Sequence, residues 1–288
     1  GMPYTDGMFD SFRRAYGYDI RPRLHHLFCE PLTPEVMRSR IDFREWCGRR
    51  FETAWLKRIA DWCHAHDLRL VGHISPEDDP VQQAGTISDL FPLHKHFDLP
   101  GLDLIIPAVG DADHPIINVG ILSAASARQQ QEKIGIMSES LGASGTNFTG
   151  PEARKIINWQ TTMGLNNPVV HGAFLSMEGN RAIEAPPDFG PSSDIWPDMV
   201  QLNSDLPEFQ RILADARQVA PVAILWPIRS FYLRTDFWQA KRGGLREEFL
   251  ELLLACLEGH VGVHLLDEPD LWDADVAEGE IRIGHAAY

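Results

Sequence analysis

This 288-residue sequence has few cysteines and no long apolar run. Its four cysteines show no C-x-x-C or comparable spacing, so neither a disulfide framework nor a cysteine-ligated metal site is expected. Cys47 and Cys63 fall on the apolar face of an expected helix and are interpreted as small core side chains. No apolar run approaches the ~20 residues that cross a bilayer, so no membrane partner is predicted.

Basic residues are also scarce. The chain has 26 Lys and Arg against 41 Asp and Glu, a formal net charge of −15. Such a charge repels nucleic acid and anionic membranes, which favours a neutral or cationic small ligand. Eight Trp and twelve His mildly favour a carbohydrate ligand, because Trp stacks on sugar faces and His hydrogen-bonds hydroxyls. Core packing remains the commoner use of any one Trp, Trp226 included.

Targeting and cofactor signals are missing as well. We recognise no secretory leader in this sequence, so a cytoplasmic location is the default expectation. The G-x-S-x-G pattern of a serine nucleophile elbow is absent around Ser138 and Ser140. No cofactor is predicted.

Helical and strand patterns alternate along the first 220 residues. Helices are predicted at 8–18, 34–66, 119–131, 151–163 and 206–218, and strands at 68–74, 102–107, 134–139 and 168–175. Thr149 followed by Glu152 forms a capping box before the fourth helix. The alternation predicts a parallel sheet with right-handed crossovers, and the residues between 178 and 205 are expected to form a loop.

A second section begins at Pro221 and predicts a small, truncated α/β domain. Strands are expected at 222–227, 261–266 and, weakly, 281–283, with a helix at 245–258. The predicted domains are therefore 1–220 and 221–288. A parallel (β/α)8 barrel needs eight strands and four fit before residue 206, so the first section is either an open sheet or part of a TIM barrel.

Polar side chains follow the predicted strands. Glu139 ends the apolar run 134–139, where a parallel barrel places catalytic carboxylates. The candidate site residues are His73, Glu77, Asp103, Glu139, Asn166 and His171. Because parallel strands end at one edge of a sheet, we expect side chains at strand ends to meet there. Glu139 is the predicted catalytic residue and the other five are predicted to bind substrate.

Each candidate also has a structural alternative. Glu139 could cap the loop that follows it, and Glu77 could belong to a solvated acidic loop at 77–79. The histidines His73 and His171 could be satisfied within the protein, and Asp103 follows a Pro-Gly pair that favours turns.

Two further features have structural alternatives as well. Asn166 could stabilise its own loop. His94 and His96 have a metal-like spacing that is weak alone, and no metal is predicted.

Several short motifs, taken in order, resemble the alpha-L-rhamnosidase-type glycoside hydrolases of family 106 and their uncharacterised relatives. The matching pieces are Tyr4-Thr5-Asp6, Phe12, Tyr16-Gly17-Tyr18-Asp19, Asp61-Trp62-Cys63, Gly72-His73, Leu99-Pro100-Gly101-Leu102-Asp103, Ser138-Glu139-Ser140, Ser144-Gly145, Trp159, Gly164-Leu165-Asn166, His171 and Ala223-Ile224-Leu225-Trp226-Pro227-Ile228. The ordered series covers nearly the whole chain.

This resemblance implies that the chain carries strands five to eight of a (β/α)8 barrel and the start of an amidotransferase-like domain. The family's general acid is then expected on the missing half. Glu139 becomes the second carboxylate, a base or nucleophile. The family also uses calcium, but no carboxylate cluster here has a clear ligand spacing, so calcium is not carried over.

The function that follows is a glycoside hydrolase-like protein that cleaves O-glycosidic bonds of a deoxy-sugar such as rhamnose. The alternative is a degenerate carbohydrate-binding or structural fragment that lacks the general acid. Half a barrel leaves two sheet edges and an inner face uncovered, so a homo-oligomer is predicted.

Overall fold

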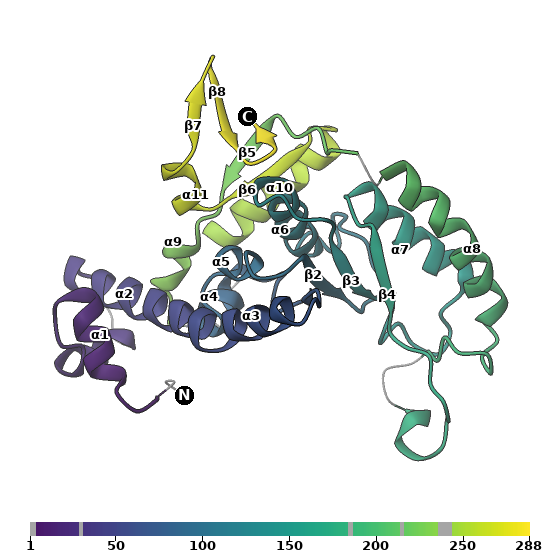
Figure 1. The fold of residues 1–288 in the computed structure, drawn as a ribbon, viewed down its shortest axis with the longest axis horizontal. Helices are drawn as coiled ribbons and strands as arrows, with labels where there is room; N and C mark the ends of the chain where they lie inside the picture. The colour runs from purple at the N-terminus through teal and green to yellow at the C-terminus, as the bar shows by residue number, and fades with distance from the viewer. Residues whose placement is uncertain (1–3, 29–30, 184–186, 214–215, 236–243) are drawn as a thin grey trace.

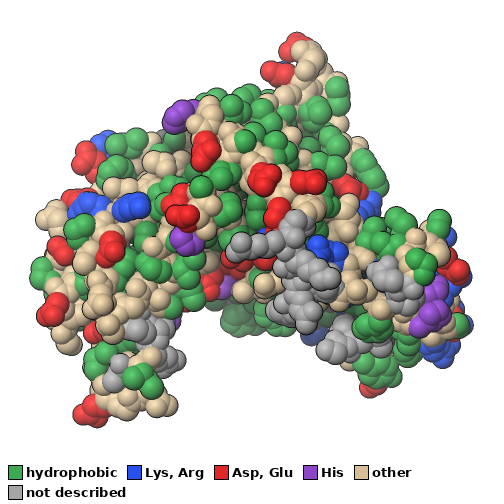
Figure 2. All heavy atoms as spheres, turned by 180° about the vertical axis from the view of Figure 1, so that it is seen from behind, with side chains coloured by type: hydrophobic (Ala, Val, Ile, Leu, Met, Phe, Trp, Pro, Cys, Tyr) green, Lys and Arg blue, Asp and Glu red, His purple; other side chains and the backbone are tan. Residues whose placement is uncertain are grey.

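The computed structural model describes residues 4–28, 31–183, 187–213, 216–235 and 244–288. Cys29 lies outside the described residues, and the thiols of Cys47, Cys63 and Cys256 are free. None of the helices in these ranges is long and apolar enough to span a membrane. Seen from behind, the surface carries more acidic than basic side chains, in keeping with the net charge (Figure 2).

A four-stranded parallel sheet forms the centre of the molecule (Figure 1). Its strands lie in chain order: β1 (Val71–Gly72), β2 (Leu99–Leu104), β3 (Met137–Ser140) and β4 (Asn167–Val170). The sheet curls into half of a (β/α)8 barrel, with a small α/β unit after it. The predicted fold, a partial TIM barrel followed by a smaller α/β unit, is confirmed.

One long helical segment precedes the sheet. It comprises α2 (Pro34–Phe51), a π-helical turn η2 (Glu52–Leu56) and α3 (Lys57–Ala65), which confirms the helix predicted at 34–66. Thr33 caps it by accepting a hydrogen bond from the Val36 amide, with Pro34 at the first helical position. Two short elements lie before it, α1 (Met8–Tyr16) and η1 (Arg21–Leu27).

The crossover helices cover the outer face of the sheet. They are α4 (Pro80–Thr86), α5 (Leu90–His94), α6 (Ile117–Gln130), α7 (Gly150–Thr162) and α8 (Trp196–Leu213), with the short η3 (Gly179–Ala182) before the last. The capping box of α7 is confirmed, because Glu152 accepts from the Thr149 amide at 2.8 Å. The start predicted for the last helix, 206, was wrong. Pro207 lies inside α8 and does not begin it.

The predicted strand boundaries also needed correction. The strand predicted at 68–74 shortens to the two residues of β1. The strand predicted at 102–107 begins three residues earlier, because Pro100 and Gly101 continue the ladder beside Gly72 and Met137 where a turn was expected. Pro lacks an amide donor but can lie near the start of a strand, as Pro100 does here.

The C-terminal unit holds two small sheets. Parallel strands β5 (Val222–Leu225) and β6 (Val263–Leu266) form one, and antiparallel β7 (Asp275–Ala277), β8 (Glu280–Ile283) and β9 (Ala286–Ala287) form the other. Its helices are α9 (Ile228–Tyr232), α10 (Leu245–Glu258) and α11 (Glu268–Trp272). The weak strand predicted at 281–283 is therefore one member of a hairpin-like sheet.

The C-terminal unit shares the main hydrophobic core with the half-barrel. Leu253 of α10 and Leu265 of β6 belong to the same buried cluster as Ile121 of α6 and Leu102 of β2. Trp226 is fully buried in this cluster and is therefore a core residue. The boundary at residue 220 stays a prediction, because one core continues across it.

The strand register decides which side chains share a face. Asp103 pairs with Glu139, and Glu139 with Val169, so these three side chains point to the inner face. Leu102 pairs with Ser138 and points outward, toward the helices. The inner face corresponds to the interior of a complete barrel.

Candidate functional site at the C-terminal edge of the sheet

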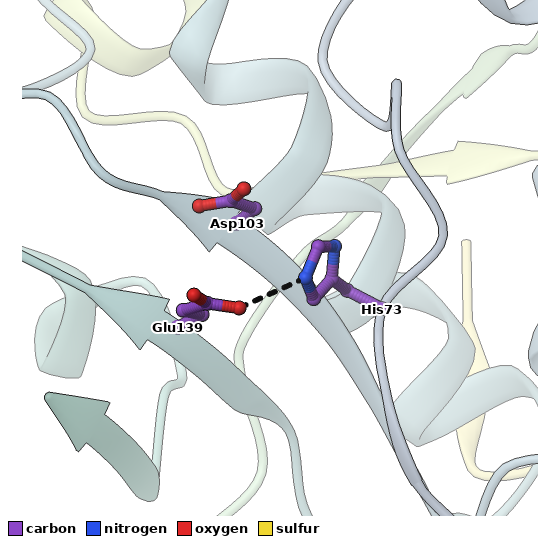
Figure 3. A group of neighbouring side chains, drawn as sticks. All are labelled: His73, Asp103 and Glu139. Carbon is purple, nitrogen blue, oxygen red and sulfur yellow. Dashed lines mark hydrogen bonds and ion pairs between the residues drawn. The ribbon is translucent and has the colours of Figure 1, made fainter. Parts of the chain in front are cut away.

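Three titratable side chains meet on the inner face near the carboxyl ends of the strands (Figure 3). His73 follows β1, Asp103 lies on β2 and Glu139 on β3. Each offers a nitrogen or oxygen atom within 4.8 Å of the other two. The expectation that strand-end side chains meet at one edge holds for these three residues.

His73 lies between two carboxylates. Its Nε2 donates to Glu139 Oε2 at 3.1 Å, and its Nδ1 forms an ion pair with Glu77 Oε1, also at 3.1 Å. Contact with Glu77 is the largest cause that raises the pKa of His73 to about 9, with Asp103 and Glu139 adding to it against the opposing effect of burial. The ring is therefore an imidazolium at neutral pH.

Glu77 is a buried member of this group. Its residue is 2% exposed, and its side chain also accepts a hydrogen bond from the Asp103 backbone amide. Asp79 is 4% exposed, caps α4 and pairs with Arg246 at 3.0 Å. The alternative of a solvated loop at 77–79 was wrong, because the run turns inward beneath the strand ends.

Two aspartates here have raised pKa values. Burial is the main cause that raises the pKa of Asp103 to about 6, and the negative charges of Glu77 and Glu139 add to it. Burial likewise raises the pKa of Asp78 to about 6, with Glu77 as the next cause. Asp78 could not be recognised from the sequence, because an acidic tripeptide usually indicates solvent exposure.

His171 reaches the same group from β4. Its Nε2 lies 3.9 Å from Glu139 Oε1, and its backbone amide donates to Ser140 at 2.9 Å. Gly142 allows this approach, because a Cβ at that position would lie 2.9 Å from the His171 ring. The predicted substrate-binding residue is therefore placed beside Glu139, with its ring partly open to solvent.

Asn166 does not join the group. It precedes β4, at the opposite end of the strands from His171, and its Oδ1 accepts from the Ile136 amide at 2.9 Å and from the Asn167 side chain at 2.8 Å. These bonds match the loop-stabilising alternative. Its role in substrate binding stays a prediction that the geometry does not favour.

The donor set does not fit calcium. His73, Asp103 and Glu139 could each give one ligand atom to a metal ion. Calcium prefers about six to eight oxygen ligands, whereas this group offers two carboxylates and a ring whose two nitrogens already face Glu77 and Glu139. Elsewhere, His94 is buried in the core and His96 pairs with Glu52 at 2.9 Å, so these two do not share a ligand site.

The group opens to solvent and is not enclosed. The side chains of His73, Glu139 and His171 are 21%, 29% and 37% exposed. Among the described residues, a cavity of about 190 Å³ lies away from this group, between α2, α5 and α9. Glu139 is thus at the rim predicted for it, but the wall that would face it across a complete barrel is not among the described residues.

Comparison with known proteins finds likeness in fold. No protein-family model matches the sequence, and no curated protein matches it either. A rhamnosidase from Novosphingobium sp. PP1Y superposes with a TM-score of 0.67 at 16% identity, over 99% of this chain and 26% of that one. A catalytic mutant of a GH42 beta-galactosidase from G. stearothermophilus gives 0.60 at 11% identity, over 93% and 44%.

This chain shares the fold of the parts of these two proteins that it covers. The chain spans only about a quarter of the rhamnosidase and less than half of the beta-galactosidase. Identities of 16% and 11% concern the fold alone. The specific family suggested by the sequence motifs stays a prediction.

Proposed function

We propose that this protein hydrolyses O-glycosidic bonds of a deoxy-sugar such as rhamnose, with Glu139 as base or nucleophile. The observation that carries the proposal is the Glu77–His73–Glu139 chain at the rim of a half-barrel. A base or nucleophile needs a fixed orientation toward the substrate, and the hydrogen bond from His73 Nε2 at 3.1 Å orients the Glu139 side chain. The glycoside-hydrolase fold of the neighbours supports the same reaction class.

The substrate would approach from the open side of the sheet. Glu139 and His171 are partly exposed there, and a neutral sugar is not repelled by the acidic surface. In this proposal His171, 3.9 Å from Glu139, donates a hydrogen bond to a sugar hydroxyl. His73 holds Glu139 in position and therefore acts as a positioning residue.

The test is hydrolysis of an aryl alpha-L-rhamnoside. Glu139→Gln keeps the shape of the side chain and removes its charge, so the rate should fall at least about 100-fold. Glu258→Gln, an exposed glutamate at the end of α10, is the matched control and should leave the rate unchanged. A Glu139→Gln variant that turns over at the original rate would end the proposal.

A second candidate is a degenerate carbohydrate-binding protein. It is favoured by one observation, the close spacing of Glu139 and Asp103. Oxygens of these two carboxyl groups come within 4.8 Å, closer than the ~5–5.5 Å of retaining enzymes and the ~6.5–9.5 Å of inverting ones. This candidate predicts rhamnose binding in calorimetry, weakened by Glu139→Gln, with no hydrolysis by the unaltered chain.

A further inference from the structure

Both ends of the half-barrel present open strand edges. Among the described residues, β1 pairs only with β2, and β4 pairs only with β3. Each outer edge therefore carries backbone N–H and C=O groups without a neighbouring strand. Parallel sheets are normally covered on both faces, whereas Val71 and Val169 on the inner face of the two edge strands are 45% and 47% exposed.

Apolar side chains are exposed at the β1 end in the strand and in the helix layer. We call this the β1 edge surface: Trp55, Trp62, Leu68 and Val71, which are 45–57% exposed. Trp62 stacks on His66 and Trp55 on Phe51, so both indoles have fixed positions. His64 anchors α3 beside the sheet through Asp98, which also accepts from the Leu70 amide just before β1.

The β4 end has a matching surface. We call this the β4 edge surface: Val169, Val200, Phe209 and Ile212, which are 43–60% exposed. Three of them lie on α8, which packs beside α7 at the far end of the sheet (Figure 1). Gln210 of α8 donates to the Asn166 carbonyl at 2.8 Å and so fixes α8 at the start of β4. Exposed apolar side chains thus occur in the strand layer and in the helix layer, at the β1 end and at the β4 end of the sheet.

We propose that a second copy of this chain completes the barrel, with the β1 edge surface of each copy against the β4 edge surface of the other. A TIM barrel has eight parallel strands, and two copies supply four each. A two-fold axis along the barrel repeats the same contact twice and leaves no strand edge open. A dimer that used only one strand edge of each copy would leave the second strand edge of each copy exposed.

This arrangement also completes the candidate site, an inference that rests on the proposed function. The strands of both copies run in the same direction along the two-fold axis, so both strand-end groups lie at the same mouth. A second Glu139 then faces the first across the barrel. Cleavage of a glycosidic bond needs two carboxyl groups, and one copy would supply each.

Association is tested with two charge substitutions. Val71→Asp and Val169→Lys each place one charge in both contacts of the dimer and should give single copies. An equimolar mixture can form a dimer with one unaltered contact and one Asp–Lys contact, so mixing should restore association. Light scattering would show particles of twice 32.4 kDa for the unaltered chain and for the mixture. A salt concentration of about 0.15 M screens the net charge of −15 per copy.

The control is Val276→Asp on β7, an exposed valine remote from both surfaces, which should leave the dimer intact. Circular dichroism checks that each variant is folded. An unaltered chain of 32.4 kDa at micromolar concentration would overturn the proposal. A mixture of folded variants that stays at that mass would overturn it too.

Whether the two copies share one catalytic site is tested separately, by the rate of hydrolysis. A dimer assembled from Val169→Lys and a Val71→Asp copy that also carries Glu139→Gln holds one Glu139. A shared site should lose at least about 100-fold in hydrolysis, whereas two independent sites would lose half. A loss of half would overturn the shared site and leave the dimer standing. If the unaltered chain hydrolyses no glycoside, the proposed function fails, and the mass measurement still decides the association.

Discussion

The polar side chains on the two faces of the central sheet have different kinds of partner. On the outer face, Ser138 and Ser140 are fully buried, and each hydrogen-bonds the Gln160 side chain of α7. Leu102 and Leu104 of the neighbouring strand pack into the main core. Ser138, Ser140 and Gln160 thus hydrogen-bond neutral partners. This part of the outer face contributes stability and no reactive group.

On the inner face, the polar groups are held by charge. His73, Glu77 and Glu139 form a chain of ion pairs, and the pKa values of His73 and Asp103 are raised. Asp103 Oδ1 is buried without a hydrogen-bond partner. Alternate side chains of a strand point to opposite faces, so the two faces differ in character. The outer-face side chains pack against the helices and stabilise the fold. The inner face carries titratable groups with shifted pKa values.

The largest expected difference between the faces is in stability. Leu102→Ala removes a side chain that is 2% exposed, so it should lower the free energy of unfolding by about 2–5 kcal/mol. Val169→Ala on the inner face should cost less than about 1 kcal/mol, because 47% of that residue is exposed. Both are measured by urea denaturation in the Val71→Asp chain, for which we expect a single copy. Equal costs would show that the inner face is as well packed as the outer one.

The next largest effect on the free energy of unfolding is expected from the hydrogen bonds among Ser138, Ser140 and Gln160 on the outer face. Gln160→Leu leaves the hydroxyls of Ser138 and Ser140 without their amide partner in a site closed to water, at a cost of about 1–3 kcal/mol. Replacing both serines by alanine in the same chain should recover much of that loss, because no buried polar group is then left unpaired. The same denaturation experiment compares the single and triple variants. A triple variant weaker than Gln160→Leu would contradict the role given to these bonds.

The outer face was the more predictable one from sequence. Helical periodicity located α6, α7 and α10 to within about two residues, because a packed helix carries its apolar stripe in the sequence. Strand limits were harder, since Pro100-Gly101 is typical of a turn and only the neighbouring strands show that it continues β2. The start of α8 was missed because Pro207 is a common helix opener.

The inner face was predictable only in part. Strand-end positions identified Glu139, His73, Asp103 and His171, because parallel strands bring their ends together. Burial of Glu77 could not be foreseen, since it depends on how residues 76–80 turn beneath β2. Asn166 is the candidate for which position near a strand was misleading. It precedes its strand, so it lies at the wrong end of the sheet for the site.

The smallest expected effect concerns pH and would test whether charge holds the inner face. The folded pKa of His73, about 9, lies above the unfolded value of about 6.5. Its contribution is therefore complete below pH 6.5 and is lost as pH rises through 9. Solvent reaches the ring, so screening reduces the contribution to about 1–2 kcal/mol. Asp103 acts in a lower window, with stability lost as pH rises from about 3.8 through 6.

Glu77→Gln isolates the cause. It removes the largest contribution to the shift, so the pKa of His73 should fall toward its usual value and the loss of stability between pH 6.5 and 9 should shrink. Proton NMR of the imidazole follows the pKa directly, and urea denaturation at several pH values follows stability. Glu258→Gln, far from the ring, should change neither. If His73 titrates near 6.5 in the unaltered chain, no imidazolium holds Glu139, and the two faces differ only in exposure.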